Sequence, residues 1–486
     1  MMLQQRKCDL TGQPIISMYR PNAPFPVYKI SEWWSDKWEG TDYGIDYNPQ
    51  ESFFDQFFKL KNKVPHHNLN IEYNLVTNSE YVNYCSRLKN CYLVSDADTD
   101  EDCYYCYTIA NSKNLVDCSK VFRSELCYDC LDCTDCYQVL YSQDCSKCSD
   151  SFFLKNCFGC NNCFCCANLH GQNYCWHNEQ LTKEEYQKKL DTVNLNSRQK
   201  IKGLKEEFRK FYLKYPQRYM HGISNVDSNG DYLYHTQRTK NSYDCRNAQN
   251  CRYCYSLLFA MADSYDVFQW GNDSQLLYEG VVVGDHDYHC KFCFQCYPSC
   301  QYLEYCFNCI CSKNCFGCVG LKKREFCILN KQYSEKSFDE LRIKIIENMK
   351  KSGEYGEFFP VKFSPFAYNE TNAMFFYPLK KEEALEKGHT WFDQEKSQQA
   401  TKDSYLCACG RQFKIIPQEN EFYQKLNIPL PDKCYLCRHI ERLHQRNPQK
   451  LWSRQCQKCH KEIQTTYAPD RPEIVYCEQC YNKEIY

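Results

Sequence analysis

Every third residue is small or apolar over two long stretches of the chain. Between residues 85 and 175, all cysteines except Cys165 are separated by multiples of three. The same spacing recurs from residue 245 to 327, with a slip of one position at Pro298 and with Cys311 out of phase. An α-helix repeats every 3.6 residues and a strand every two, so neither element explains this spacing. In a parallel β-solenoid, a short side followed by a turn directs every third residue inward. The sequence therefore predicts a mainly β protein with two cysteine-rich β-solenoid (β-helix) modules.

The residues that precede the inward cysteines support corners at these positions. Many are Asn or Asp, which tolerate left-handed and turn conformations; they are Asn90, Asp102, Asp117, Asp129, Asp132, Asp135, Asp144, Asn156 and Asn162. Coils of twelve, eighteen or twenty-one residues would all keep the inward positions small or apolar, apart from Asp100 and Gln172. The coil length and the handedness therefore stay open.

Two internal duplications organise the chain. Residues 166–180 recur 152 positions later as residues 318–332, and each copy runs into a charged helical stretch. Residues 3–28 match residues 451–476 at a shift of 448, but this first copy keeps only Cys8 of four cysteines. The duplications predict a degenerate zinc-ribbon-like unit plus helical linker (1–66), solenoid module 1 (67–181), a helical segment (182–222), solenoid module 2 (223–333), a helix and linker (334–400), a four-cysteine zinc domain (401–447) and a four-cysteine zinc ribbon (448–486).

We expect the degenerate unit to fold by packing alone, without a metal ion. Thr11, Lys29 and Glu32 stand where the C-terminal copy has its other three cysteines. Its core is predicted to contain Trp33, Trp34 and Trp38. The chain begins only seven residues before Cys8, so whether ligands lie upstream of Met1 stays open.

Two sets of four cysteines near the C-terminus have the spacing of metal ligands. Two CxxC turns, each supplying two thiolates, can hold one tetrahedral Zn²⁺ ion with a hairpin between them. The second set has one shortened, CxC turn. The sequence predicts two Zn(2+) ions per chain, one held by Cys456, Cys459, Cys477 and Cys480 and one by Cys407, Cys409, Cys434 and Cys437. His439, His444 and His460 are interpreted as surface residues, because four cysteines suffice.

The solenoid thiols allow three interpretations. Free cysteine is a small apolar residue that can fill an interior too narrow for leucine. Runs such as Cys127-x2-Cys130-x2-Cys133-x2-Cys136 also have the local spacing of metal ligands, although a solenoid would spread them around the coil. Disulfides between stacked coils are the third interpretation. The many tyrosines between these cysteines are expected on the outer faces.

Basic residues occur at every fourth position between and within the two zinc units: Arg438, Arg442, Arg446, Lys450, Arg454 and Lys458. On a helix this spacing makes a positive stripe that suits the phosphates of a nucleic acid. A solvated helix face explains the same pattern, and Pro448 interrupts any continuous helix. Nucleic acid is therefore a possible partner, beside an unidentified protein partner.

Composition excludes several classes of protein. The 486 residues carry a formal net charge of −1, so no global field directs the chain to nucleic acid or membrane. No apolar run reaches the length of a membrane span, and no secretory signal is visible, so a cytoplasmic location with reduced thiols is expected. No phosphate loop, dinucleotide fingerprint, nucleophile elbow or HExxH motif occurs. Residues 285–290 could bind a catalytic metal, but an exposed loop is favoured, and no enzymatic activity is predicted.

The chain resembles a group of cysteine-rich zinc-ribbon and β-solenoid proteins of uncultivated small-genome bacteria. Six segments carry the resemblance across nearly the whole chain: residues 8–12, 33–38, 328–333, 365–370, 427–431 and 467–473. It implies the architecture and the zinc ions but no activity. The expected function is that of a non-enzymatic zinc-binding scaffold that presents its solenoid faces to a protein partner. Metal storage by the solenoid thiols and nucleic-acid binding are the alternatives.

Overall fold

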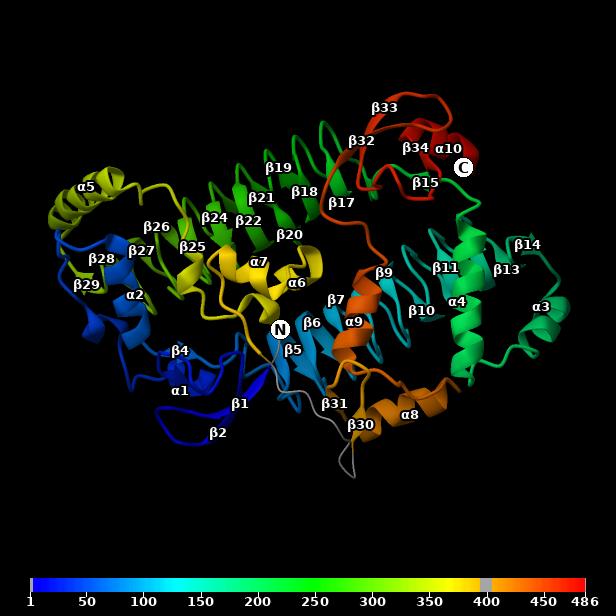
Figure 1. Ribbon diagram of the computed structural model, residues 1–486, viewed down its shortest axis with the longest axis horizontal. Helices are drawn as coiled ribbons and strands as arrows, with labels where there is room; N and C mark the ends of the chain where they lie inside the picture. The colour runs from blue at the N-terminus through cyan, green and yellow to red at the C-terminus, as the bar shows by residue number, and fades with distance from the viewer. Residues whose placement is uncertain (1–2, 394–403, 486) are drawn as a thin grey trace.

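The computed structural model describes residues 3–393 and 404–485. Two parallel β-solenoids lie within residues 82–328, separated in the chain by two helices; they lie side by side and run in opposite directions (Figure 1). Small antiparallel sheets and helices make up the rest, so the predicted fold class is confirmed. The expected boundary at residue 400 lies outside the described residues. The first solenoid contains β5 (Val82–Lys89), β6 (Val94–Glu101), β7 (Tyr107–Ala110), β8 (Ser119–Phe122), β9 (Leu131–Thr134), β10 (Tyr137–Leu140), β11 (Ser149–Lys155), β12 (Asn161–Ala167) and β13 (Asn173–Trp176), followed by the short antiparallel β14 (Glu179–Gln180).

The second solenoid runs from β16 to β28. Its main side contains β16 (Gly222–Ile223), β17 (Gly230–Tyr234), β18 (Ser242–Arg246), β20 (Tyr255–Leu257), β22 (Tyr265–Trp270), β24 (Tyr278–Val281), β25 (Lys291–Phe294), β26 (Gln301–Glu304), β27 (Lys313–Phe316) and β28 (Glu325–Ile328). A further side contains β19 (Ala248–Gln249), β21 (Met261–Ala262) and β23 (Ser274–Gln275), and β29 (Lys331–Gln332) folds back on β28.

Each coil of the first solenoid has twelve residues. Strand partners such as Val82 and Val94, or Cys163 and Cys175, are twelve positions apart. A coil is therefore four triplets, and each inward residue stacks on the residue twelve positions later. This register settles the coil length that the sequence left open.

Four consecutive coils of the second solenoid have thirteen residues. The partners Tyr255, Phe268, Val281, Phe294 and Phe307 follow one another at intervals of thirteen. Each of these coils has one residue more than a coil of four triplets. After three such coils the added residues make one complete triplet, so the cysteines from residue 245 to 296 keep their three-residue spacing. The residue added by the fourth coil shifts that spacing by one position, which is the slip at Pro298.

The residue before almost every inward position has a left-handed backbone. Asp117 and Asp129 have φ values of 54° and 51°, as their residue type predicts. Bulky residues such as Phe153 (φ 56°) adopt the same conformation, so the coil imposes it whatever the side chain. Cys165 and Cys311 are corner residues of this kind, with φ of 54° and 48°. Their position explains why both break the cysteine phase.

The inward side chains form hydrogen bonds with the coil that encloses them. The Cys106 thiol donates to the carbonyls of Tyr104 (3.3 Å) and Leu115 (3.6 Å), two residues back and nine residues ahead. The same geometry recurs at most inward cysteines, and none of the described cysteines forms a disulfide. At inward serines, the hydroxyl donates to the residue two back; Ser112 also accepts the N–H of Ser124 (3.2 Å). Small polar side chains therefore suit this narrow interior.

Two inward carboxyls replace serine in this role. Asp100 Oδ1 accepts the N–H of Ser112 at 2.8 Å, and Asp287 Oδ1 accepts the N–H of Cys300 at 2.7 Å. Burial raises the pKa of Asp100 to about 8 and the pKa of Asp287 to about 7. Residues 285–290 are therefore a corner of the coil rather than an exposed loop, although His286 itself is exposed.

Each solenoid is covered at one end by the helix that precedes the other solenoid. Helix α4 (Arg198–Tyr212) packs on the end of the first solenoid, with Phe208 against Phe153. Helix α2 (Phe53–Lys63) packs on the end of the second, with Phe53 against Phe316 (Figure 1). This exchange ties the two halves of the chain together. The other helices before residue 400 are α1 (Ile30–Trp33), α3 (Lys183–Leu190), α5 (Glu335–Ser352), α6 (Ala373–Phe376) and α7 (Lys381–Glu386).

The two chain ends form matching ribbons. In the first, β1 (Gln4–Lys7) pairs with β2 (Pro14–Ser17); in the second, β32 (Trp452–Gln455) pairs with β33 (Glu462–Thr465) in the same register, shifted by 448. The third strands, β3 (Val27–Tyr28) and β34 (Val475–Tyr476), pair with β4 (His66–His67) and β15 (Gln217–Arg218). Each ribbon thus joins the strand that leads into one solenoid.

The tryptophans of the first ribbon divide between core and surface. Trp33 and Trp38 are buried, but they pack with α2 and the second solenoid, which corrects the prediction that they form the core of the ribbon itself. Trp34 is 42% exposed, which corrects its assignment to the core. Among the described helices, none is both long and apolar enough to cross a lipid bilayer.

The left-handed corners predict opposite effects for glycine at two exposed lysines. Lys147 is a corner residue (φ 55°), whereas Lys113 has no positive φ. Lys147→Gly relieves the cost of the left-handed conformation, so we expect the free energy of unfolding to stay unchanged or rise by up to about 1 kcal/mol. Lys113→Gly should lower it by about 1 kcal/mol. Urea unfolding of both variants checks this; equal losses would contradict the role of the corners.

Candidate metal centres and the arginine helix

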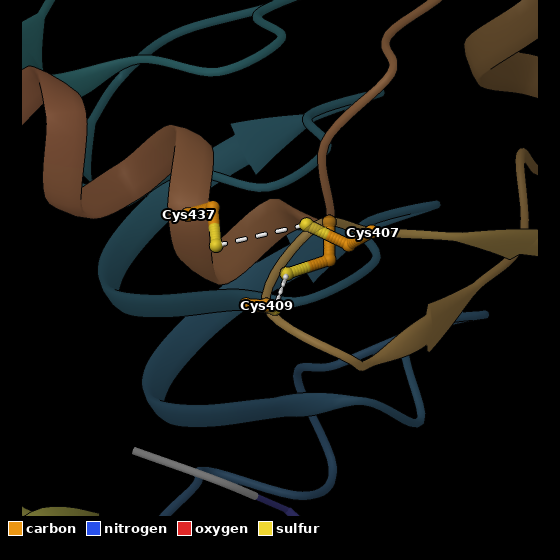
Figure 2. A group of neighbouring side chains, drawn as sticks. Cys407, Cys409 and Cys437 are labelled. Atoms are coloured by element: carbon orange, nitrogen blue, oxygen red, sulfur yellow. Dashed lines mark hydrogen bonds between the residues drawn. The ribbon is translucent and has the colours of Figure 1, made fainter. Parts of the chain in front are cut away.

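The first cysteine cluster joins a small hairpin to the start of a helix. Cys407 and Cys409 lie on the turn between β30 (Tyr405–Leu406) and β31 (Gln412–Phe413), and Cys434 caps helix α9 (Tyr435–Leu443), which contains Cys437. Figure 2 shows the sulfur atoms of Cys407 and Cys437 turned toward each other, with Cys409 beside them. The Sγ–Sγ distance is 3.7 Å from Cys407 to Cys437 and 3.7 Å from Cys409 to Cys434. Helix α8 (Pro417–Lys425) connects the two halves of the cluster.

The second cluster has the same plan. Cys456 and Cys459 follow β32, and Cys477 and Cys480 lie at the start of helix α10 (Glu478–Ile485). The Sγ atoms of Cys459 and Cys477 are 3.7 Å apart. In both clusters, all four Sγ atoms lie within 4.8 Å of one another.

This geometry fits a tetrahedral metal ion. Four thiolates about 2.3 Å from a zinc ion lie roughly 3.8 Å from one another. The observed 3.7 Å separations agree with that spacing. Each cluster could therefore hold one metal ion.

Backbone amides favour the thiolate form of one cysteine in each cluster. Burial alone would raise the pKa of Cys407, but the N–H groups of Cys409 and Cys434 lower it to about 7. In the second cluster, the N–H groups of Cys477 and Cys459 oppose burial and lower the pKa of Cys456 to about 6. The Cys477 N–H lies 3.2 Å from Cys456 Sγ. Helix N-termini, where each second pair of cysteines lies, also favour negative charge.

The first ribbon keeps the fold of this site with one ligand. The Lys29 N–H lies 3.3 Å from Cys8 Sγ, as the Cys477 N–H does from Cys456 in the second ribbon. Buried apolar residues around Cys8, among them Ile15 and Val27, fill the core of this ribbon.

Three arginines of the predicted stripe are buried in ion pairs. Arg438 contacts Asp117 (2.6 Å) and Glu419 (3.2 Å). Arg442, which is 1% exposed, contacts the same Asp117 at 3.1 Å and Asp129 at 3.5 Å. Helix α9 therefore lies along the first solenoid rather than facing solvent (Figure 1).

Arg446 reaches both solenoids. Its guanidinium contacts Asp132 of the first solenoid (3.1 Å) and Asp244 of the second (2.6 Å), and it stacks on Tyr232 at 3.9 Å. Burial alone would raise the pKa of Asp244, but Arg446 and Lys120 lower it below its ordinary value. Burial raises the pKa of Asp132 to about 7 despite Arg446, with Asp144 and Asp244 adding to the rise.

The remaining predicted basic residues lie beyond α9. Arg454 donates to the carbonyl of Ala468, as Arg6 does to Arg20 in the first ribbon. Lys458 forms an ion pair with Glu484, and Lys450 lies over the ring of Trp452 at 5.3 Å. The six residues therefore do not make one continuous exposed stripe.

Two further sequence interpretations need correction. His439 is buried between Tyr107 and Phe375 rather than lying at the surface. Asp117, Asp129 and Asp132 form corners as the sequence predicts, but they also pair with the arginines. Asp244, for which the sequence predicts no role, does the same. The spacing carried a signal, since Asp117 and Asp129 are one coil apart. Neighbouring coils are about 4.8 Å apart, and residues four positions apart on a helix are separated by about 6 Å along its axis. Aspartates on successive coils can therefore pair with arginines at every fourth helix position.

No protein-family model matches the sequence, and no curated protein matches it. Among solved structures, a match is found to a crystal structure from Desulfovibrio desulfuricans G20 described as a "putative acetyltransferase". The match covers 55% of this chain and 79% of that chain, with 9% sequence identity and a TM-score of 0.11. So low a TM-score carries no argument about fold or activity. The chain is thus a cysteine-rich β-solenoid protein with two four-cysteine clusters that could each hold a metal ion.

The buried arginines predict a large loss of stability when one is removed. Arg442→Met leaves Asp117 and Asp129 buried with one cation fewer, so the free energy of unfolding should fall by about 3 kcal/mol. This is the low end of the range for buried pairs, because Arg438 and Lys205 still reach the same carboxylates. Urea unfolding measures the change.

Lys458→Met is the matched control, because it removes an exposed ion pair and should cost less than about 1 kcal/mol. Equal effects of Arg442→Met and Lys458→Met would contradict the internal role of α9.

Proposed function

We propose that the protein is a non-enzymatic, zinc-binding scaffold in which two zinc ions hold two solenoids in a fixed arrangement. We call residues 404–485, which contain both cysteine clusters and contact both solenoids, the clamp. One observation carries the proposal: directly after Cys434 and Cys437, the arginines of α9 and its C-terminal extension enter ion pairs with aspartates of both solenoids.

The second cluster supports the same role for its metal. Its ribbon pairs β34 with β15, the strand that leads into the second solenoid. Thr466 of that ribbon donates to Asp231 of the second solenoid, and Tyr481 of α10 donates to Asn168 of the first. Both metal centres thus act where the C-terminal region holds the two solenoids.

Zinc suits both clusters better than a harder ion. Four thiolates in tetrahedral geometry are typical of structural zinc sites, which keep no open position for a substrate. Such a centre contributes folding free energy, since its ligands are not assembled in the unfolded chain.

The outer surface of the second solenoid is the favoured face for a protein partner. Tyr253, Tyr265, Tyr288 and Tyr302 are exposed, and they form two pairs, each on successive coils. The ring centroids of Tyr253 and Tyr265 are 5.2 Å apart, and those of Tyr288 and Tyr302 are 5.6 Å apart. Exposed tyrosines supply contact area at low entropic cost and are enriched in interfaces.

The alternatives receive less support. The solenoid thiols are directed at backbone carbonyls around the coil, which does not favour metal storage. Arg438, Arg442 and Arg446 are engaged internally, which does not favour their contact with nucleic acid.

The metal content of the chain is the first test. Protein purified anaerobically without added metal should contain about two zinc ions per chain by elemental analysis, with the cysteines outside the two clusters free in thiol titration. Five or more metal ions per chain would contradict the scaffold and make the solenoid thiols ligands.

Single ligand variants test the clamp. Cys437→Ser should lose one zinc ion and increase hydrogen exchange along α9, because the helix start is no longer anchored. Cys480→Ser should lose the other ion and increase exchange at β15 instead. Cys311→Ser, a solenoid corner outside both clusters, is the control and should keep both ions. Loss of metal without any change in hydrogen exchange would contradict the proposal that the ions hold the solenoids in place.

A further inference from the structure

A buried lysine without a counter-ion lies at a cavity between α2, the second solenoid and the segment that precedes α7. Lys61 is 3% exposed. Every other buried lysine or arginine in the described ranges has a carboxylate oxygen within 4 Å, namely Arg6, Lys120, Lys155, Arg438 and Arg442. Lys61 has no ion pair and its amine has no hydrogen-bond acceptor among the described residues. Within residues 3–393 and 404–485, it is the one buried lysine or arginine without a carboxylate partner.

The surroundings of the amine are aromatic. Its Nζ lies 4.8 Å from the ring centre of Phe25, 5.3 Å from that of Phe307 and 5.7 Å from that of Phe58. These rings attract a cation, but they do not replace the hydrogen bonds that an ammonium loses on burial. Accordingly, burial lowers the pKa of Lys61 to about 7.

The cavity beside Lys61 has a volume of about 280 Å³. Its wall is mostly aromatic and aliphatic and includes Phe57, Phe294, Phe359 and Phe366; it contains no acidic residue. It shares Val281 and several other wall residues with a larger cavity of about 770 Å³ between the two solenoids. The smaller volume is near the lower end for small-molecule sites.

We propose that this cavity binds an apolar monocarboxylate whose carboxylate pairs with the Lys61 ammonium and whose tail lies among the phenylalanines. One unpaired cation at the wall of an apolar cavity complements one anionic head on an apolar body. The ligand restores the counter-ion that every other buried cation already has. The site is independent of the zinc clusters.

Calorimetric titration of the full-length protein with decanoate tests the proposal. Decanoate should bind at one site per chain, and decanol, which has the same chain without the charge, should bind at least tenfold more weakly. Lys61→Met keeps the volume and apolar contacts but removes the charge, so decanoate affinity should fall at least tenfold. Lys59→Met, on the exposed side of the same helix, is the matched control and should bind like the unchanged protein.

Thermal unfolding checks that the Lys61→Met variant folds. Because an unpaired buried amine is costly, this variant should melt at a higher temperature than the unchanged protein near pH 7. The difference in melting temperature between the two proteins should decrease from pH 7 to pH 10.5, because the lysine of the unfolded chain then also loses its proton. Ala373→Phe, which narrows the cavity without touching Lys61, should also weaken decanoate binding.

The pH dependence gives a second readout. Binding should weaken as the pH rises above about 7, because the Lys61 amine, whose pKa is about 7 in the free protein, must then take up a proton to pair with the carboxylate. The neighbouring titratable groups are His66, whose ring bonds the Lys61 carbonyl, His67, and His389 on the cavity wall. Equal affinity for decanoate and decanol, or no binding of decanoate, would overturn the proposal. So would decanal forming a borohydride-reducible adduct at Lys61 without decanoate binding, since the amine would then serve as a nucleophile.

Discussion

The left-handed corner at every third residue is the constraint on which the rest of the structure depends. It folds twelve residues into a coil of four triplets, so the interior is narrow and each inward residue faces backbone carbonyls of its own and the next coil. Cysteine fits this interior because it is small, apolar and still a weak donor. The abundance of cysteine thus follows from the width of the coil, and the eight cysteines of the two clusters are a separate population with a different geometry.

The same corners also organise the ionic contacts between the solenoids and the C-terminal region. Asp favours a left-handed corner, and at that corner its carboxylate points outward from the coil. Asp117 and Asp129 therefore form a column of negative charge that the arginines of α9 match. Burying these charges is expensive unless they are paired, so the pairs fix the position of α9 more than they add stability. A local backbone requirement is in this way converted into a specific docking surface.

Much of this architecture follows from the sequence, because the triplet spacing, the duplications and the cysteine spacings are local patterns. The solenoids, the two four-cysteine clusters and the degenerate ribbon were predictable for that reason. The coil length was not, since all inward positions look alike and three added residues in the second solenoid imitate a triplet. The burial of Arg438, Arg442 and Arg446 could not be predicted either, because a stripe of arginines has the same sequence pattern whether it faces solvent or a column of aspartates. Trp34 differs from Trp33 only by which side of a short helix it occupies.

The packing of α2 on the second solenoid and of α4 on the first accounts for the position of the Lys61 site, away from the metal clusters. Because α2 precedes the first solenoid but covers the second, it brings a helix from one half of the duplication onto the other half. Lys61 lies on the covered face of this helix, four residues after Phe57. The equivalent face of α4 packs Phe208 against the first solenoid and carries no buried lysine. The two halves of the chain have thus diverged at the surface where they meet, and only one of them carries the buried cation for which we propose a ligand.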